Sequence, residues 1–252
     1  MKEEEFYNQS KCTGLIKVLS NLKKNKVVCI DGKWGTGKSY FCDKLIEQSS
    51  QGLECIKFNA FEHDHKENPL ILLLAEFSKV VSENDTEKER YIKAVAKHSV
   101  PLIGKSLDFA LSLASLKELP VVQGASDKLK LYLEERINNY LYAEESVQGI
   151  KYELNKVVSR SGDKKIVVII DELDRCRPSF ALEIIEKIKH VFNVEGVHFI
   201  LSMNKKQVLE SVSHTYGIDS NSESYLEKFI DFTMEALKKS LPSAIIRLSS
   251  TA

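Results

Sequence analysis

The residues best suited to chemistry lie in the octet Gly-Lys-Trp-Gly-Thr-Gly-Lys-Ser, which covers Gly32–Ser39. This octet fits the pattern G-x-x-x-x-G-K-S, in which glycines let successive backbone N–H groups turn toward one anion. Lys38 can reach the β- and γ-phosphates of a nucleotide, and the hydroxyl of Ser39 can bind Mg²⁺. The pattern therefore predicts a loop that binds a nucleoside triphosphate together with Mg²⁺.

The neighbouring residues supply the setting that such a loop requires. Lys26–Asp31 is a short run rich in β-branched residues that predicts a buried strand, and Lys38–Ser50 predicts a helix. The loop would then join a strand to a helix whose N-terminal dipole faces the phosphates. Trp34 is expected either to cap the phosphates or to pack under the helix. The predicted nucleotide-binding residues are Gly32, Trp34, Gly35, Thr36, Gly37, Lys38, Ser39 and Tyr40.

A second group of candidate residues follows Ile166–Ile170, a run of five consecutive Ile and Val residues. Such a run indicates a strand buried on both faces, and Asp171 and Glu172 follow it directly. Uncompensated charges are unfavourable in a core, so these carboxylates belong at the exposed end of the strand. Asp171 is predicted to bind Mg²⁺ with Ser39, and Glu172 to orient or deprotonate the attacking water. An acidic pair near the start of the next helix is the alternative.

Two arginines and a short run of metal-binding residue types add weaker candidates. Arg175 or Arg177 could act as an arginine finger, in cis or across a subunit boundary, and the alternatives are an ion pair with Asp174 or a contact at the start of the next helix. The run Glu62–His65 holds potential metal ligands, but a solvated loop is favoured because no other ligand cluster lies near it in the sequence.

Composition excludes several classes of protein. Lys plus Arg equals Asp plus Glu at 36 each, so net charge gives no general attraction to nucleic acid or anionic membranes. The acidic start, Met1–Glu5, lacks the apolar segment of a secretory signal. The five cysteines form no Cys-x-x-Cys pair, which favours free thiols in the cytoplasm. Lys105 and Asp108 interrupt the most apolar stretch, Ser99–Leu119, so it is not a clean spanning helix.

Strand and helix patterns alternate along the chain, as in α/β proteins with a mostly parallel sheet covered on both faces. Residues 1–252 are expected to form one domain with a helical insertion over residues 69–159. The further predicted strands are Leu53–Asn59 and Val197–Met203. The further predicted helices are Glu3–Asn25, Pro69–Ser82, one or two over Ser126–Ser159 with a break near Gly149, Pro178–Asn193, Lys205–Tyr216 and Ser224–Lys239.

Four runs together resemble the KAP family of P-loop NTPases, and they occur in the order typical of that family from about Leu15 to Phe232. Besides the loop with its internal Trp34, they are Phe58–Phe61 (FNAF), Asp171–Cys176 (DELDRC) and Tyr225–Lys228 (YLEK). The resemblance implies an ASCE-type three-layer sandwich with the acidic strand next to the phosphate-loop strand. It also implies hydrolysis of ATP with Mg²⁺, coupled to conformational change or assembly.

The resemblance also implies a cellular setting. Many family members are associated with membranes through spanning helices in the insertion, and some take part in bacteriophage exclusion. This chain lacks a convincing spanning helix, so association is expected to be at most peripheral, at the cytoplasmic face. A homo-oligomer or a partner protein is expected, and no feature of the sequence indicates nucleic acid.

Several positions depart from the family pattern. Phe61 stands where Trp is usual, and Glu172 stands where Asp is common, which retains a carboxylate. Asn204 stands where Asp is frequent and resembles a sensor for the γ-phosphate or the attacking water. The resemblance marks Lys228 as nucleotide-responsive, and the alternative is a surface lysine on an amphipathic helix. A C-terminal helical region that usually follows it in the family is expected to be missing. The predicted catalytic residues are Glu172, Lys38, Asn204 and Arg175.

Two other functions remain open at this point. The chain could be a nucleotide-gated binding module with little turnover, because the C-terminal region usual in the family is expected to be missing. It could also be a small-molecule kinase, since kinases use the same loop, although the Asp171–Glu172 pair favours activation of water.

Overall fold

The apolar runs of the sequence form a parallel sheet. The computed structural model describes residues 3–49, 52–65, 68–81, 85–103, 125–216 and 222–235. Within them lies one five-stranded sheet of order β2-β3-β4-β1-β5, in which every neighbouring pair is parallel. The strands are β1 (Lys26–Asp31), β2 (Leu53–Asn59), β3 (Lys165–Asp171), β4 (Val197–Met203) and β5 (Phe232–Glu235). The predicted α/β class with a parallel sheet is confirmed.

The order of the strands corrects one expectation. The acidic strand β3 does not lie next to the phosphate-loop strand β1, because β4 pairs with both and separates them. Every residue of β4 is buried. A strand buried in this way is stable only in the interior of a sheet, where both of its edges find hydrogen-bonding partners.

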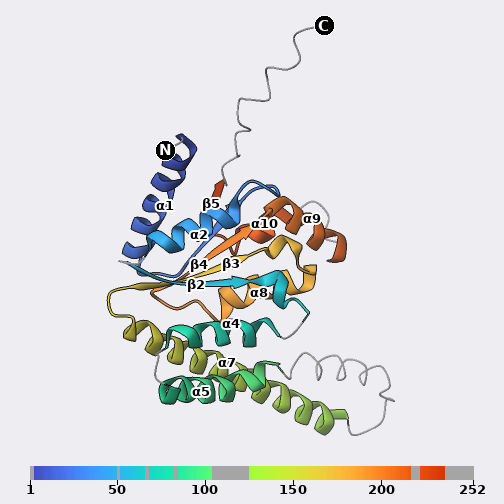
Figure 1. Cartoon of the computed structure of the whole chain (residues 1–252). Helices are drawn as coiled ribbons and strands as arrows, with labels where there is room; N and C mark the ends of the chain where they lie inside the picture. Colours follow the sequence, from blue (N-terminus) through green and yellow to red (C-terminus); the bar gives the residue numbers. More distant parts are fainter. Residues whose placement is uncertain are drawn as a thin grey trace, which may run out of the picture.

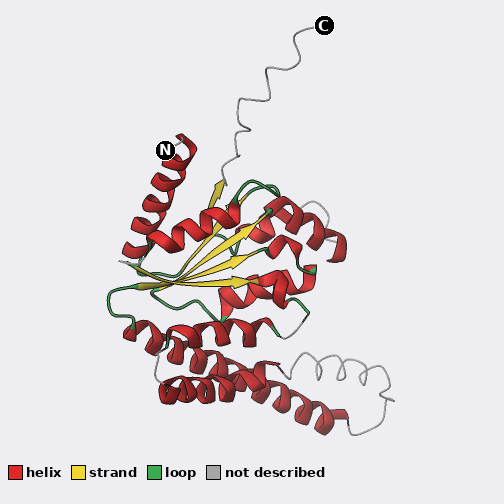
Figure 2. Cartoon of the chain, in the orientation of Figure 1, coloured by secondary structure: helices red, strands yellow, loops and turns green. Residues whose placement is uncertain are grey.

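Helices cover both faces of the sheet (Figures 1 and 2). The helices α1 (Glu3–Asn21) and α2 (Lys38–Gln48) pack on one face, over a core that includes Val28, Val167 and Ile200. The opposite face is covered by α4 (Pro69–Phe77), α8 (Pro178–His190), α9 (Lys205–Tyr216) and α10 (Ser222–Glu227). Alternate residues of each strand therefore enter different cores, as the pleat requires.

Several observed elements differ from the predicted boundaries. The helix α1 ends at Asn21, before the predicted Asn25, whose side-chain amide instead donates to the carbonyls of Phe192 and Val197. The other short elements are α3 (Ala60–His63), which takes in the start of the run Glu62–His65 where a solvated loop was favoured, and the 3-10 turns η1 (Ser78–Val80) and η3 (Leu173–Arg175).

Two long helices, α5 (Asp85–Ile103) and α7 (Ala125–Arg160), pack together beyond α4, on the side away from the sheet (Figure 1). The predicted break near Gly149 is wrong, because α7 continues through it. A Cβ at Gly149 would lie 2.3 Å from Nδ1 of His98 on α5, so the glycine permits close packing of the two helices. Within the described residues no helix is long and apolar enough to span a membrane. Residues 104–124 of the predicted insertion lie outside the described part.

The predicted helix Ser224–Lys239 is also wrong. The helix α10 ends at Glu227, and β5 follows it and pairs with β1. Asp231 starts this pairing, since its N–H donates to the Val27 carbonyl at 2.8 Å and its carboxylate accepts from the Val27 N–H at 2.9 Å. The segment forms a strand despite its helical periodicity, because the free edge of β1 needs backbone hydrogen-bonding partners. Residues 236–239 of this predicted helix lie outside the described part.

A buried histidine on β4 makes stability depend on pH. His198 has no exposed surface, and burial lowers its pKa below the ordinary 6.5, although the Leu22 carbonyl near Nε2 partly offsets this effect. The unfolded chain then binds more protons, so acidification below about pH 6.5 should lower the free energy of unfolding, by up to about 1.4 kcal/mol per pH unit. Urea unfolding at pH 7.5 and 5.5 should show a smaller loss for His198→Phe than for the unmodified protein. The exposed His65, changed to Phe, is the control, and equal losses in all three proteins would contradict this prediction.

Candidate functional site

One cavity of about 280 Å³ joins most of the predicted site residues at the carboxyl ends of the strands. Ligands of parallel α/β sheets commonly bind at this edge. The loop after β1 and the turn after β3 supply its walls, and Gly32 and Asn204 are the predicted residues that do not line it. The lining residues are Trp34, Gly35, Thr36, Gly37, Lys38, Ser39, Tyr40, Asp171, Glu172, Asp174 and Arg175.

The loop between β1 and α2 has the backbone shape that an anion site needs. Gly35 and Gly37 adopt positive φ angles of 77° and 86°, which residues with a Cβ rarely tolerate. No side chain caps α2, and its first turn carries no acidic residue. The N–H groups of that turn can therefore bind an anionic ligand, which the helix dipole also favours.

Lys38 directs its ammonium group into this loop. Its Nζ donates to the Gly32 carbonyl at 2.6 Å and to the Lys33 carbonyl at 3.3 Å. Gly32 thus holds the lysine through its backbone carbonyl, although it does not line the cavity. A cation at this position lies beside the N–H groups of the loop, where it would meet the same phosphate groups.

Asp171 is buried at the end of β3 and is held by a network of polar groups. Its Oδ1 accepts hydrogen bonds from Ser202 Oγ at 2.7 Å and from the Glu172 N–H at 3.0 Å. The ammonium of Lys57 lies 3.8 Å from Oδ2 and also pairs with Asp43 of α2. These contacts fix the carboxylate and offset its charge, which burial at 4% exposure would otherwise disfavour.

The sequence analysis missed Ser202 and Lys57, although each leaves a signal. Ser202 places a hydroxyl in the wholly buried strand β4, and Lys57 is the one exposed residue of β2. A polar side chain within a buried strand needs a hydrogen-bonding partner, and the acceptor here is the predicted metal-binding carboxylate. Such residues could have been chosen as neighbours of Asp171 if the strand order had been known.

Glu172 has a strained backbone and a side chain held by two donors. Its φ of 61° is the only positive value at a non-glycine residue in the described ranges, and such outliers are common at functional sites. Arg175 Nη1 lies 2.9 Å from Glu172 Oε1, and Asn59 Nδ2 donates to Oε2 at 3.3 Å. Asn59, at the end of β2, is a further contact that the sequence analysis missed.

Comparison with known proteins identifies the family to which this site belongs. A family model described as the KAP family P-loop domain matches residues 9–251. The chain belongs to the KAP P-loop family. The predicted resemblance is thus confirmed, and with it the P-loop NTPase fold.

This KAP domain is also similar to individual proteins. It is 22% identical over 236 residues to the phage T7 exclusion protein of Escherichia coli (strain K12). That alignment covers 85% of this chain and 30% of the relative, so the KAP domain spans less than a third of that protein. Among solved structures, the Aeropyrum pernix ORC2 protein in its ADPNP–ADP complexes matches with a TM-score of 0.43 and 11% identity, over 90% of this chain and 47% of that one. Its ADP form matches with a TM-score of 0.40.

The two arginines of the KAP domain occupy different surroundings. Arg175 lines the cavity and pairs with Glu172, whereas the predicted alternative was a pair with Asp174. Arg177 binds the carboxylate of Asp64 through Nε and its backbone N–H, both at 2.9 Å, and also the Asp64 carbonyl. Arg177 therefore joins α8 to α3, and Arg175 is the arginine placed near the nucleotide loop.

Three further candidates lie outside the cavity of the KAP domain. Asn204 caps α9, since its Oδ1 accepts from the Gln207 N–H at 3.4 Å, and its role as a sensor stays a prediction. The ammonium of Lys228 lies 6.0 Å from the ring centroid of Tyr225. The run Glu62–His65 does not converge on a point, and no described cluster has three or more His, Cys, Asp or Glu side chains placed for a metal ion.

The oxygen donors present suit Mg²⁺. This ion prefers few protein ligands, keeps several waters, and commonly binds one or two carboxylates together with substrate phosphates. The cavity offers the hydroxyl of Ser39 and the carboxylate of Asp171. Among the described contacts, Oδ2 of Asp171 has the ion pair with Lys57 at 3.8 Å and accepts no hydrogen bond. These two residues could hold the ion beside the loop.

Proposed function

We propose that this KAP domain binds ATP with Mg²⁺ and hydrolyses it. The observation that supports this most is the meeting of Lys38, Ser39, Asp171 and Glu172 on the wall of one cavity. They come from two segments that are far apart in the sequence. A loop that only binds phosphate would not need a buried aspartate and a second carboxylate opposite it.

In the proposed reaction each residue has a separate task. The N–H groups of the loop and the ammonium of Lys38 hold the β- and γ-phosphates, and Ser39 and Asp171 hold Mg²⁺, which neutralises charge on the phosphates. Glu172 orients the attacking water by accepting a hydrogen bond from it and takes up its proton as the water attacks. Arg175, next to Glu172, is placed to stabilise negative charge that develops on the transferred phosphoryl group.

Release of phosphate by the purified protein tests this proposal. We expect ATP turnover that requires Mg²⁺ and is lost in excess EDTA. Turnover per chain should also be measured over a wide range of protein concentrations. A steep rise would indicate a catalytic group contributed by a second copy, as proposed for a homo-oligomer. Absence of ATP binding at any concentration would contradict the proposed function.

A nucleotide-gated binding module is the second candidate, and one observation favours it. Both carboxylate oxygens of Glu172 already have donors, Arg175 and Asn59, and this arrangement would slow activation of water. Light scattering with ADP, ATP and a non-hydrolysable analogue would reveal nucleotide-dependent assembly. A small-molecule kinase would instead transfer phosphate to an added acceptor.

We also propose a role in defence against bacteriophage. The proposed location is the cytoplasm, with peripheral membrane contact at most. The name of the phage T7 exclusion protein supports this proposal, although the similarity covers only 30% of that protein. Phage plating on cells that produce the unmodified chain or its Lys38→Ala variant tests it. Equal plating on both would contradict a nucleotide-dependent defence role, and liposome flotation tests membrane contact.

A further inference from the structure

The indole of Trp34 bridges two sides of the cavity. Its Nε1 donates to Asp174 Oδ2 at 2.9 Å, and both residues line the cavity, one from the phosphate loop and one from the turn η3. The Trp34 residue is 63% exposed. Apolar packing therefore does little to place this large ring, and the hydrogen bond to a carboxylate is its main specific contact.

Within the described part of the chain, this bridge is the one side-chain hydrogen bond that joins residues 33–37, here called the outer loop, to the domain beyond α2. Among the hydrogen bonds of the described residues, no other joins residues 33–37 to a residue beyond the loop and α2. The remaining bonds of this stretch are internal, such as Thr36 to the Lys33 carbonyl. The outer loop contains Gly35 and Gly37, whose backbones have wide conformational freedom, so a single tie can restrict it considerably.

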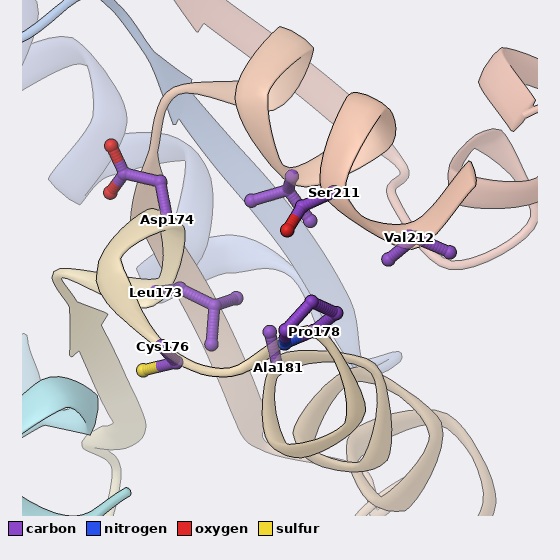
Figure 3. A pocket seen from close by; sticks show the side chains of 8 residues that line it. Leu173, Asp174, Cys176, Pro178, Ala181, Ser211 and Val212 are labelled. Carbon is purple, nitrogen blue, oxygen red and sulfur yellow. The ribbon is translucent and has the colours of Figure 1, made fainter. Parts of the chain in front are cut away.

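The backbone of Asp174 is held in place by the turn η3. The preceding residue, Leu173, is fully buried, and the turn is closed by hydrogen bonds from Arg175 N–H to the Glu172 carbonyl and from Cys176 N–H to the Leu173 carbonyl. Figure 3 shows the Asp174 carboxylate pointing away from Pro178 and Ala181, which line a second, small pocket together with Asp174 itself. The acceptor is thus fixed, while the donor belongs to the glycine-containing loop.

We propose that Asp174 is a positioning residue that acts through Trp34. The bridge holds the phosphate loop in the shape that binds nucleotide and keeps it in register with the turn that carries Glu172. A loop that is ordered before binding loses less conformational entropy on binding, which raises affinity. This inference rests on the proposed nucleotide binding and adds a residue pair that determines it.

The direction in which Asp174→Ala changes ATP affinity distinguishes ordering of the loop from simple charge repulsion. Asp174 is an anion on the wall of a cavity proposed to hold a polyanion. If charge alone mattered, Asp174→Ala would remove a repulsion and tighten ATP binding. If the bridge orders the loop, Asp174→Ala weakens ATP binding. Asp174→Asn keeps an oxygen acceptor for the indole, so ATP binding is retained in that variant.

Fluorescence of the protein without nucleotide tests the bridge itself. The chain has a single tryptophan, so its emission reports on Trp34 alone. We expect Asp174→Ala to change the emission spectrum, because the indole N–H loses its carboxylate acceptor, and Asp174→Asn to change it less. Tyr142, which is equally exposed at 62% and lies on α7, provides the control Tyr142→Ala. An unchanged spectrum in Asp174→Ala would overturn the bridge.

Calorimetric titration with ATP and Mg²⁺ tests its consequence. We expect Asp174→Ala and Trp34→Phe each to weaken binding by about five- to tenfold, the size of a typical net hydrogen bond, with Asp174→Asn within about twofold. The double variant should be no weaker than either single variant, since both remove the same interaction. Tighter binding by Asp174→Ala, or additive losses, would overturn the inference while leaving the proposed function intact. Failure of the unmodified protein to bind ATP would overturn both.

Discussion

Replacing Glu172 with glutamine should lower the rate of ATP turnover by about 10²- to 10⁴-fold, while ATP affinity changes by less than about threefold. Glutamine has nearly the same size but cannot accept a proton from the attacking water. Binding should persist because the loop, Lys38 and Asp171 hold the phosphates and the metal. Steady-state phosphate release gives the rate, and calorimetric titration gives the affinity.

A second glutamate provides the matched control for this substitution. Asn59 Nδ2 donates to Glu62 Oε1 at 3.1 Å as well as to Glu172, but Glu62 does not line the cavity. Glu62→Gln should therefore leave turnover within about twofold, since it perturbs the same asparagine without removing the carboxylate at the site. Turnover in Glu172→Gln equal to that of the unmodified protein would rule out the proposed role of this carboxylate.

Replacing Lys38 with alanine should weaken ATP binding by about 10- to 100-fold, the range for loss of one or more hydrogen bonds to a charged partner. The ammonium of Lys38 lies inside the loop, where the Gly32 and Lys33 carbonyls hold it. Lys38 is the one lysine among the described residues that line the cavity, so no neighbouring lysine there can replace it. Calorimetric titration with ATP and Mg²⁺ measures the loss.

Lys33, in the same loop, is the control for Lys38. Its side chain is exposed and does not line the cavity, so Lys33→Ala should keep affinity within about twofold. Thermal unfolding of both variants checks that the loss in Lys38→Ala is not a loss of fold. Equal weakening by the two substitutions would show that the overall positive charge of the loop, rather than the placement of Lys38, governs binding.

Much of the sheet could be predicted from local sequence. The bounds of β1, β2 and β4 agree with the predicted strands residue for residue, because apolar runs between turn residues leave few alternatives. The position of β4 between β1 and β3 was not predictable, since strand order depends on pairings between distant segments. The strand β5 was predicted as helix for the same reason, because only the neighbouring edge of β1 makes it a strand.

The candidate site divides in the same way. Gly32–Ser39, Asp171 and Glu172 belong to short contiguous patterns whose residue types suggest their chemistry. The supporting contacts join residues far apart in sequence: Ser202 to Asp171 across 31 positions, Asn59 to Glu172 across 113 and Trp34 to Asp174 across 140. None of these pairings is visible within either segment alone, so they appear only once the fold brings the segments together.

The strand that separates β1 from β3 determines how wide the site is. Neighbouring strands in a sheet lie about 4.8 Å apart, so the ends of β1 and β3 are separated by roughly twice that distance. This gap is comparable to the combined width of a phosphate group and a hydrated cation. The clearance between Lys38 and the Asp171–Glu172 pair is thus a property of the backbone hydrogen-bond spacing. Substitutions in the side chains around the cavity can change affinity and rate, but they leave this separation in place.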